Sequence, residues 1–132
     1  MNILFVCKFN RFRSKIAEAF FNKLNNNSKY FAKSAGIIKG RTITNDILKP
    51  AKEFGLKIKS QPIGLSVELL MWADLIIITA DDVPKTIFTN NFQYSKKVNV
   101  WKIHDVNGNK MIKEIIKIQN HVTKLIYNLE KP

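Results

Sequence analysis

A single cysteine stands six positions before an arginine near the start of the chain, a spacing suited to covalent chemistry on a phosphoryl group. Cys7 follows the apolar, β-prone run of residues 2–6, and Arg13 and Ser14 stand where a helical pattern begins. A loop between a strand and a helix N-terminus turns backbone N–H groups inward, and the helix dipole adds positive charge. The sequence therefore predicts a thiolate nucleophile beside a site for a tetrahedral anion.

The residues between Cys7 and the helix have separate expected roles around such an anion. The guanidinium of Arg13 is planar and can bind two phosphoryl oxygens at once. Ser14 is expected to donate a hydrogen bond to the sulfur of Cys7, and Asn10 to adopt left-handed backbone angles and bond across the loop. The expected substrate-binding residues are Lys8, Phe9, Asn10, Arg11, Phe12, Arg13 and Ser14.

A second group must protonate the departing oxygen and later activate water. Asp105 follows the last predicted strand and is the candidate for this role, although an aspartate three residues before Gly108 also suits a simple turn. Cys7 has its own alternative, because a free cysteine is commonly a small buried core residue. Its position at a strand end, with an arginine six residues on, favours the catalytic interpretation.

Apolar runs alternate with helical patterns along the chain, and these elements must position the chemical groups. Continuously apolar strands are typical of a parallel sheet covered on both faces, so we expect an α/β fold that forms a three-layer sandwich. Pro50 interrupts one helical pattern, which predicts a helix start near it or an irregularity there. Strands are predicted at residues 2–6, 30–36, 74–79 and 98–103, and helices at residues 14–24, 45–54, 65–72, 83–90 and 109–129.

Candidate site residues gather at the ends of the predicted strands. Ligands of parallel α/β sheets bind beyond the carboxyl ends of the strands. Cys7, residues 34–36, residues 79–82 and the pair His104-Asp105 all follow predicted strands. Cys7 and Asp105 are therefore expected on the same rim of the sheet.

Length and composition indicate one globular domain, residues 1–132, with 45% hydrophobic residues. No apolar run approaches the roughly 18 residues of a membrane span, and Lys8 and Arg11 interrupt the first run too early for a signal peptide. The chain has one cysteine and hence no internal disulfide, which fits a reducing compartment. We expect a cytoplasmic protein without membrane association.

The net charge of +12 favours anionic partners. Most of this charge is lysine scattered singly, without a basic block or a nucleic-acid motif, so nucleic-acid binding is disfavoured but not excluded. Lys8, Arg11 and Lys15 lie around the expected anion loop. They suit a strongly anionic substrate or are ordinary solvated charges, and both interpretations remain open.

The N-terminal motif resembles the signature of low-molecular-weight protein tyrosine phosphatases, which share their fold with thioredoxin-coupled arsenate reductases. The similar residues are Phe5-Val6-Cys7, Asn10, Arg13-Ser14 and Ala17-Glu18, followed by Ser34-Ala35-Gly36, residues 51–56, residues 73–77 with Asp81, and residues 101–105. The resemblance covers nearly the whole chain. It implies a four-stranded parallel sheet in the order 2-1-3-4, a phosphocysteine at Cys7, phosphate binding by Arg13 and a general acid at Asp105.

The resemblance further implies a hydrolase that needs no metal or other cofactor and acts on a phosphorylated protein or a small phosphomonoester, as a monomer or weak dimer. This chain departs from the family's pattern around the site. Phe9 replaces a usual Gly, Phe12 an often present second cysteine, and Lys15 a usual Pro or Thr. Asp105 is followed by Val-Asn instead of Pro and aromatic residues, so tyrosine specificity does not follow.

Three functions therefore compete, and a cysteine-dependent phosphomonoester hydrolase is the leading hypothesis. Arsenate reduction through an internal disulfide relay is excluded because the chain has one cysteine, which leaves a variant that uses an external thiol. A non-catalytic anion-binding module is the third hypothesis, motivated by Phe9 and the missing aromatic residues.

The two histidines have no assigned chemistry. His104 is expected to be a partly exposed loop residue and His121 a structural one. No group of His, Cys, Asp or Glu has metal-ligand spacing.

Overall fold

Four parallel strands form one sheet in the order β2-β1-β3-β4 in the computed structural model, which describes residues 1–89 and 96–131. The predicted fold class and strand order are confirmed. The strands are β1 Asn2–Cys7, β2 Phe31–Gly36, β3 Leu75–Ile78 and β4 Lys97–Val100. The helices are α1 Arg13–Leu24, α2 Asn45–Glu53, α3 Val67–Trp72, α4 Thr86–Thr89 and α5 Lys110–Glu130.

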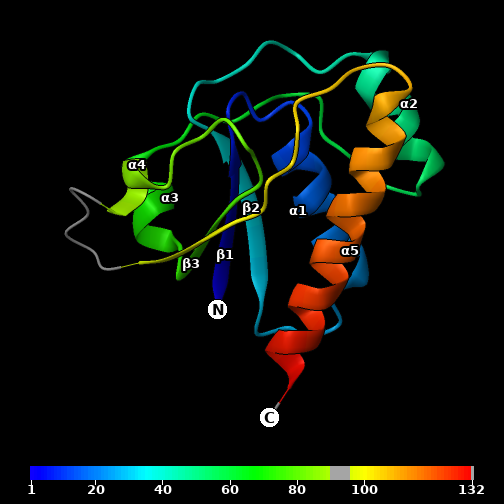
Figure 1. Ribbon diagram of the computed structural model, residues 1–132. Coiled ribbons are helices and arrows are strands. Elements are labelled where there is room, and N and C mark those ends of the chain that lie inside the picture. Colours follow the sequence, from blue (N-terminus) through cyan, green and yellow to red (C-terminus); the bar gives the residue numbers. More distant parts are fainter. Residues whose placement is uncertain (90–95, 132) are drawn as a thin grey trace.

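Alternate residues of the central strands supply two hydrophobic cores, one on each face of the sheet. Ile3 and Phe5 of β1 belong to the larger core, which also contains residues of α1, α2 and α5. Leu4 and Val6 point to the smaller core, which α3 and α4 cover. Figure 1 shows the resulting layers, with α3 and α4 on one side of the sheet and α1 and α5 on the other. Successive residues of a strand point to opposite faces of the sheet. A strand that is buried on both faces is therefore apolar at every position, as the sequence of β1 predicts.

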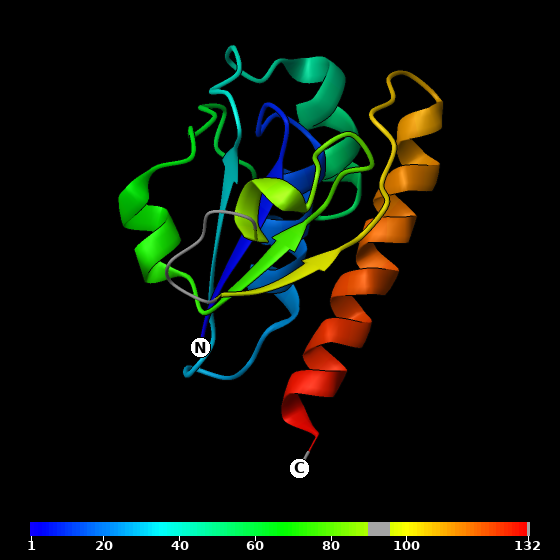
Figure 2. The same cartoon turned by 60° about the vertical axis from the view of Figure 1, so that its left-hand side comes forward.

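The loops that follow the strands gather at one end of the sheet. Figures 1 and 2 show this end opposite the two chain termini, with α2 and the start of α5 beside the loop that follows β1. Gly36 at the end of β2 approaches that loop closely, since a Cβ atom added there would lie 2.7 Å from the backbone nitrogen of Asn10. The β2 glycine therefore leaves the room that the loop after β1 requires.

Two predicted elements differ most in extent. The strand predicted over residues 98–103 ends at Val100, because the following chain turns away as Ile103 accepts a hydrogen bond from the backbone of Asp81 at 3.1 Å. β4 is an edge strand in which only Val98 is buried, so the expected cover on both faces does not extend to it. The helix predicted at residues 83–90 begins at Thr86, after Pro84, and its predicted last residue lies outside the described part.

The second helix begins at Asn45, well before Pro50, and continues through the proline to Glu53. The loss of one backbone hydrogen bond there is tolerated in a helix whose Ile47 and Ala51 are buried in the core. Ser66 caps α3 as predicted, since its side chain accepts a hydrogen bond from the Leu69 backbone at 3.2 Å.

None of the helices in residues 1–89 and 96–131 has the length and apolar character that crossing a bilayer requires.

Candidate active site

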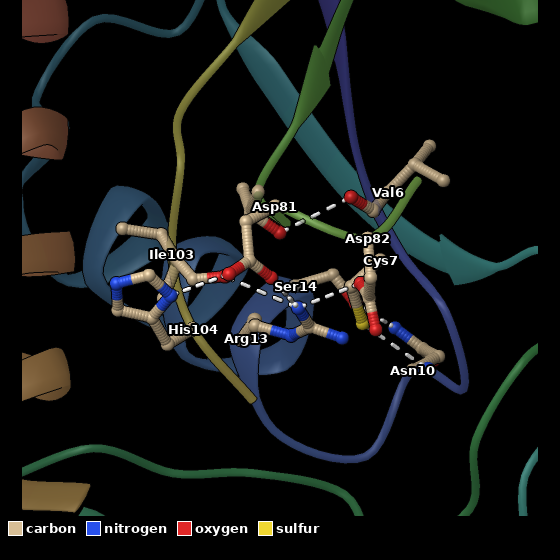
Figure 3. Close-up of polar contacts among 10 residues, drawn as sticks. Val6, Cys7, Asn10, Arg13, Ser14, Asp81, Asp82, Ile103 and His104 are labelled. Atoms are coloured by element: carbon tan, nitrogen blue, oxygen red, sulfur yellow. Dashed lines mark hydrogen bonds and ion pairs between the residues drawn. The ribbon is translucent and has the colours of Figure 1, made fainter. Parts of the chain in front are cut away.

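Cys7 is the last residue of β1 and is almost completely buried, with 2% of its surface exposed. Its sulfur lies 2.9 Å from the Ser14 hydroxyl oxygen in the first turn of α1 and accepts a hydrogen bond from the Asn10 backbone at 3.3 Å. Figure 3 shows these groups together at the turn from β1 into α1. The expected contact between Ser14 and Cys7 is therefore present, and residues 8–12, called the anion loop below, curve around the sulfur.

Asn10 fixes the shape of the anion loop from its centre. Its φ angle is +55°, in the left-handed region that asparagine tolerates better than most residues, as predicted. Its buried side-chain amide donates to the hydroxyls of Ser14 at 2.7 Å and Ser34 at 3.0 Å, and its carbonyl accepts from the Ile63 backbone at 2.8 Å. Asn10 thus ties the loop to α1, β2 and the segment that precedes α3.

The hydrogen bonds around Ser14 leave its hydroxyl hydrogen available to the Cys7 sulfur. A hydroxyl group has one hydrogen to donate. Because Ser14 already accepts from the Asn10 amide, its own hydrogen is available to the Cys7 sulfur 2.9 Å away. Ser34 behaves in the same way and donates to the Glu18 carboxylate at 2.6 Å. Sequence reasoning missed this contact with Glu18, which joins side chains 16 positions apart.

Backbone donors line the turn into α1. Among residues 1–89 and 96–131, no protein acceptor is bonded to the backbone N–H groups of residues 11–15, whereas the N–H of Ile16 bonds to Phe12 at 2.8 Å. The first turn of a helix leaves such donors unsatisfied, and here no side-chain cap takes them, because Phe12 occupies the N-cap position. This row of donors next to a thiol is an arrangement that binds an oxyanion.

Arg13 is held at one nitrogen and open at the others. Its buried guanidinium donates from Nη1 to Asp82 at 2.9 Å, to Asp81 at 3.5 Å and to the Ile103 carbonyl at 3.1 Å. No acceptor among the described residues bonds to its Nε or Nη2, so one edge of the planar group is available. Figure 3 shows the acidic pair and Ile103 gathered around Arg13 beside Cys7. An edge with two parallel N–H donors suits two oxygens of a phosphoryl group.

Sequence reasoning also missed the acidic pair that holds Arg13. Asp81 and Asp82 follow β3, where residues 79–82 were expected at the rim, but their bonds to Arg13 were not predicted. Asp81 bonds to the His104 ring as well, and this bond, followed by the charges of His104 and Arg13, lowers the pKa of the Asp81 carboxyl. His104 is exposed as predicted, but its bonded carboxylate is Asp81 and not Asp105. The signal available in the sequence was the position of both aspartates at the carboxyl end of a strand.

Asp105 is exposed and lines a cleft of about 380 Å³ together with residues of the anion loop, including Phe9, Arg11 and Phe12, and with Arg13. The structure thus brings Asp105 to the rim where the anion loop lies, which is the arrangement expected from the strand ends. Asp46 of α2 supplies a second carboxylate to the cleft. A hydrogen bond from Thr44 lowers the pKa of Asp46, with a further contribution from the charge of Arg11.

The remaining predicted binding residues have varied surroundings. Lys8 and Phe9 are exposed, with the Lys8 ammonium 5.3 Å from the centre of the Phe9 ring. The side chain of Phe12 is buried in the larger core. Arg11 is half-buried and donates to backbone carbonyls after β2. Lys15, expected at the rim, has only 5% of its surface exposed, and burial lowers its pKa.

Lys15 is buried because the first turn of α1 lies under the segment that contains Ile63, where Lys15 and Glu18 line a small hollow. The helical pattern could not reveal that this second segment covers the lysine. Within residues 1–89 and 96–131, no three His, Cys, Asp or Glu side chains come together as a metal site.

Comparison with known proteins identifies the family. The model of the family described as low molecular weight phosphotyrosine protein phosphatase matches residues 2–124, and the chain belongs to this family. The protein is therefore a cysteine-dependent phosphatase, an enzyme whose substrates are phosphorylated molecules. No curated protein matches the chain in sequence.

Solved structures with the same fold span several activities. The low molecular weight protein tyrosine phosphatase from T. tengcongensis has 26% identity and a TM-score of 0.81, with 97% of this chain and 99% of that chain covered. The arsenate reductase from Archaeoglobus fulgidus has 27% identity and a TM-score of 0.73, with 94% and 98% covered. A Cys-to-Ser mutant of YwlE arginine phosphatase with a phosphorylated active site serine has 21% identity and a TM-score of 0.85, with 99% and 97% covered.

Proposed function

We propose that the protein hydrolyses phosphomonoesters in two steps through a phosphocysteine at Cys7. The observation that carries this proposal is the Cys7 sulfur, 2.9 Å from the Ser14 hydroxyl, beside the N–H groups of residues 11–15, to which no acceptor of the described residues bonds. A thiolate at this position meets the phosphorus of an ester whose oxygens are bound by the anion loop and the open edge of Arg13. The phosphorylated serine in the mutant YwlE enzyme supports phosphoryl transfer to the nucleophile in this fold.

In the first step, the thiolate of Cys7 attacks phosphorus, the S–P bond forms and the ester P–O bond breaks. Asp105 gives its proton to the departing oxygen, which leaves as an alcohol or phenol. Arg13 and the backbone N–H groups stabilise the negative charge on the phosphoryl oxygens as it shifts. In the second step, Asp105 takes a proton from water, whose oxygen attacks phosphorus as the S–P bond breaks. Inorganic phosphate leaves, and the Ser14 hydroxyl stabilises the regenerated thiolate.

Asp105 is a better proposed acid than Asp46, the other carboxylate of the cleft. A hydrogen bond from Thr44 lowers the pKa of Asp46, which disfavours the protonated form that a general acid requires. Asp105 lies on the segment between β4 and α5, which also carries Ile103 against Arg13.

We further propose that the substrate is a phosphorylated protein or a small phosphomonoester and that the enzyme acts in the cytoplasm as a monomer or weak dimer. A thiolate nucleophile must stay reduced, and the chain has no second cysteine to protect Cys7 as a disulfide. The scattered lysines form no nucleic-acid motif, so nucleic acid is not the proposed partner.

The proposed roles are tested by steady-state hydrolysis of p-nitrophenyl phosphate and phenyl phosphate. Cys7→Ser is expected to lower kcat for both esters by at least about a thousandfold, because an alcohol replaces the thiolate. Asp105→Asn is expected to lower kcat by about a hundredfold for phenyl phosphate, and by less for the nitro compound, whose leaving group needs no proton. Asp46→Asn is the matched control and is expected to show no such dependence on the leaving group. Full activity of Cys7→Ser would refute the proposal.

Arsenate reduction with an external thiol is the second candidate, favoured by the 27% identity to the Archaeoglobus fulgidus arsenate reductase. In that reaction two thiols are oxidised to a disulfide as arsenate is reduced to arsenite, and one of them must come from a small molecule. Arsenite formation that requires both Cys7 and added glutathione, at a rate above phosphate ester hydrolysis, would favour this candidate over the phosphatase.

A further inference from the structure

The cleft beside the anion loop carries more positive than negative side chains. Its walls come from the anion loop, the segment between β2 and α2, and the segment that leads into α5. The charged residues that line it are Arg11, Arg13, Arg41, Lys110, Asp46 and Asp105. A low-dielectric wall that gathers charges of one sign concentrates ligands of the opposite sign.

Two of these cations, Arg41 and Lys110, form no ion pair with a carboxylate of the described residues. Arg13 faces Asp81 and Asp82, and the charge of Arg11 acts on Asp46, whose pKa it helps to lower. Among residues 1–89 and 96–131, neither Arg41 nor Lys110 makes an ion pair. Both side chains are exposed at the cleft, so the surplus charge lies outside the part that the transferred phosphoryl group occupies.

The anion loop holds the Arg41 segment in place without neutralising it. Arg11 donates from Nε to the Arg41 carbonyl at 3.1 Å and from Nη2 to the Thr42 carbonyl at 3.3 Å. These acceptors are neutral, so the bonds position the backbone of Arg41 next to the site and leave its guanidinium free to bind an anion. Gly40 makes this approach possible, because a Cβ atom there would lie 2.6 Å from the Phe9 carbonyl oxygen.

Lys110 occupies a position that is unfavourable for a cation in a helix. It is the first residue of α5, whose first turn contains no acidic residue and whose N-cap, Asn109, makes no side-chain capping bond. The helix dipole opposes a positive charge at this end. An anion bound between Lys110 and Arg41 would offset that repulsion and satisfy donors at the start of α5.

Apolar side chains complete the cleft between the cations. Phe9, Ile47, Val106 and Met111 line it together with the charged residues. A ring or short apolar linker fits such a wall while its anionic substituent reaches the rim.

We propose that Arg41 and Lys110 bind a second anionic group of the substrate, a carboxylate or phosphate next to the phosphoryl group that Cys7 attacks. The inference rests on the proposed phosphatase function and specifies its substrate class. Such a group is carried by an acidic residue beside a phosphorylated one, or by the second phosphate of a small bisphosphate. Both sources present the same chemistry to the two cations.

The test compares kcat/KM for meta-carboxyphenyl phosphate with that for its neutral isostere, meta-carbamoylphenyl phosphate. The wild-type enzyme is expected to prefer the carboxylate by about tenfold, which corresponds to about 1.4 kcal/mol. The double variant Arg41→Gln/Lys110→Gln is expected to bring this ratio close to one, and Arg41→Glu/Lys110→Glu to reverse it. Because the ratio compares two esters on the same enzyme, a variant that loses activity equally toward both esters leaves the ratio unchanged.

A matched control removes two charges far from the cleft. Lys97→Gln/Lys124→Gln alters exposed lysines of β4 and α5 that do not line the cleft, and the wild-type ratio is expected to persist. Phosphotyrosine peptides with Asp or Asn beside the phosphorylated residue, and aryl bisphosphates with their monophosphates, then distinguish the two sources. A higher kcat/KM for the Asp peptide than for the Asn peptide, or for the bisphosphate than for the monophosphate, supports the inference if the difference requires Arg41 and Lys110.

Different results would contradict the phosphatase function and the second anionic subsite. If the wild-type enzyme hydrolyses neither aryl ester, the proposed function fails. If it hydrolyses both with equal kcat/KM, and the double variant does the same, only the second anionic subsite is overturned. A carboxylate preference that the control variant loses as fully as the double variant would also overturn it, because the effect would then come from net charge alone.

Discussion

Arg13 is the residue whose surroundings explain most about the site. Its Nη1 is fixed by Asp82 at 2.9 Å and by the Ile103 carbonyl at 3.1 Å, while no acceptor among the described residues bonds to its Nε or Nη2. An arginine that is anchored on one side loses less conformational entropy when it binds phosphate. We therefore propose that Asp82 positions Arg13 for the phosphoryl group.

Replacing Asp82 by Ala should consequently weaken phosphate ester binding. We expect kcat/KM for p-nitrophenyl phosphate to fall about tenfold, mainly through KM, because the guanidinium is no longer held in place. Glu53→Gln, an exposed change on α2, provides the control for a simple loss of negative charge. An unchanged KM in the Asp82 variant would show that the acidic pair does not position Arg13.

The end of β2 is the element on which the anion loop rests. A Cβ atom on Gly36 would lie 2.7 Å from both the Asn10 backbone nitrogen and the Phe9 carbonyl carbon, which are backbone atoms that move only with the loop. Gly36→Ala is expected to lower kcat/KM by about tenfold or more and to reduce the free energy of unfolding by about 1–3 kcal/mol.

Gly64 provides a matched comparison for this prediction, because it forms a β-bridge with Gly36 and has no atom nearer than 3.4 Å to an added Cβ. Gly64→Ala should therefore leave both activity and unfolding free energy close to the wild-type values. Equal effects of the two substitutions would contradict the role assigned to the close approach at Gly36.

His121 of α5 makes the packing of this helix sensitive to pH. Its ring stacks on Trp101 with centroids 4.8 Å apart, and burial, followed by the charges of Lys117 and Lys124, lowers its pKa below the usual 6.5. The unfolded chain then binds a proton more readily than the folded one. Stability from this group is present above pH 6.5 and is lost as the pH falls through the lower folded pKa.

His121→Phe keeps an aromatic ring against Trp101 and removes the titration. We expect urea unfolding of the wild-type protein to show a decrease in free energy between about pH 7 and pH 5, and the variant to show a smaller decrease over the same interval. An identical pH dependence in the two proteins would exclude His121 as its source.

The sequence predicted local contacts better than distant ones. Ser14 and Asn10 lie within seven residues of Cys7. The contact of Ser14 with the sulfur and the left-handed angles of Asn10 were expected because a strand-to-helix turn has few ways to close. The bond between Asp82 and Arg13 joins residues 69 positions apart, and it depends on how two loops meet at the rim. Lys15 shows the same limit, since helical periodicity does not reveal which other segment covers a residue.

At the scale of the whole molecule, 22 lysines and arginines outnumber 10 aspartates and glutamates, which gives a net charge of +12. Within residues 1–89 and 96–131, the ion pairs involve only Arg13, His104, Asp81 and Asp82. Scattered cations repel one another in the compact state, and salt screens this repulsion over about 10 Å at 0.1 M. The apolar layers on both faces of the sheet must therefore hold the fold against its own charge.

Sodium chloride should accordingly stabilise the protein at low ionic strength. We expect Tm to rise by about 3–6 °C between 0.01 M and 0.15 M salt, which corresponds to about 1 kcal/mol for a domain of this size. Chloride is used instead of phosphate so that binding at the active site does not contribute. A Tm that falls over this range would show that favourable charge pairs outweigh the repulsion.

The covalent step at Cys7 is the central claim, and the phosphorylated enzyme tests it most directly. The Asp105→Asn variant is mixed with excess p-nitrophenyl phosphate, and the intact protein and its peptides are examined by mass spectrometry during turnover. We predict a burst of nitrophenolate of about one equivalent per protein, with one phosphoryl group on Cys7, because loss of the base slows hydrolysis of the S–P bond. Continued turnover with no phosphoryl group on Cys7, or with one on another residue, would contradict the account.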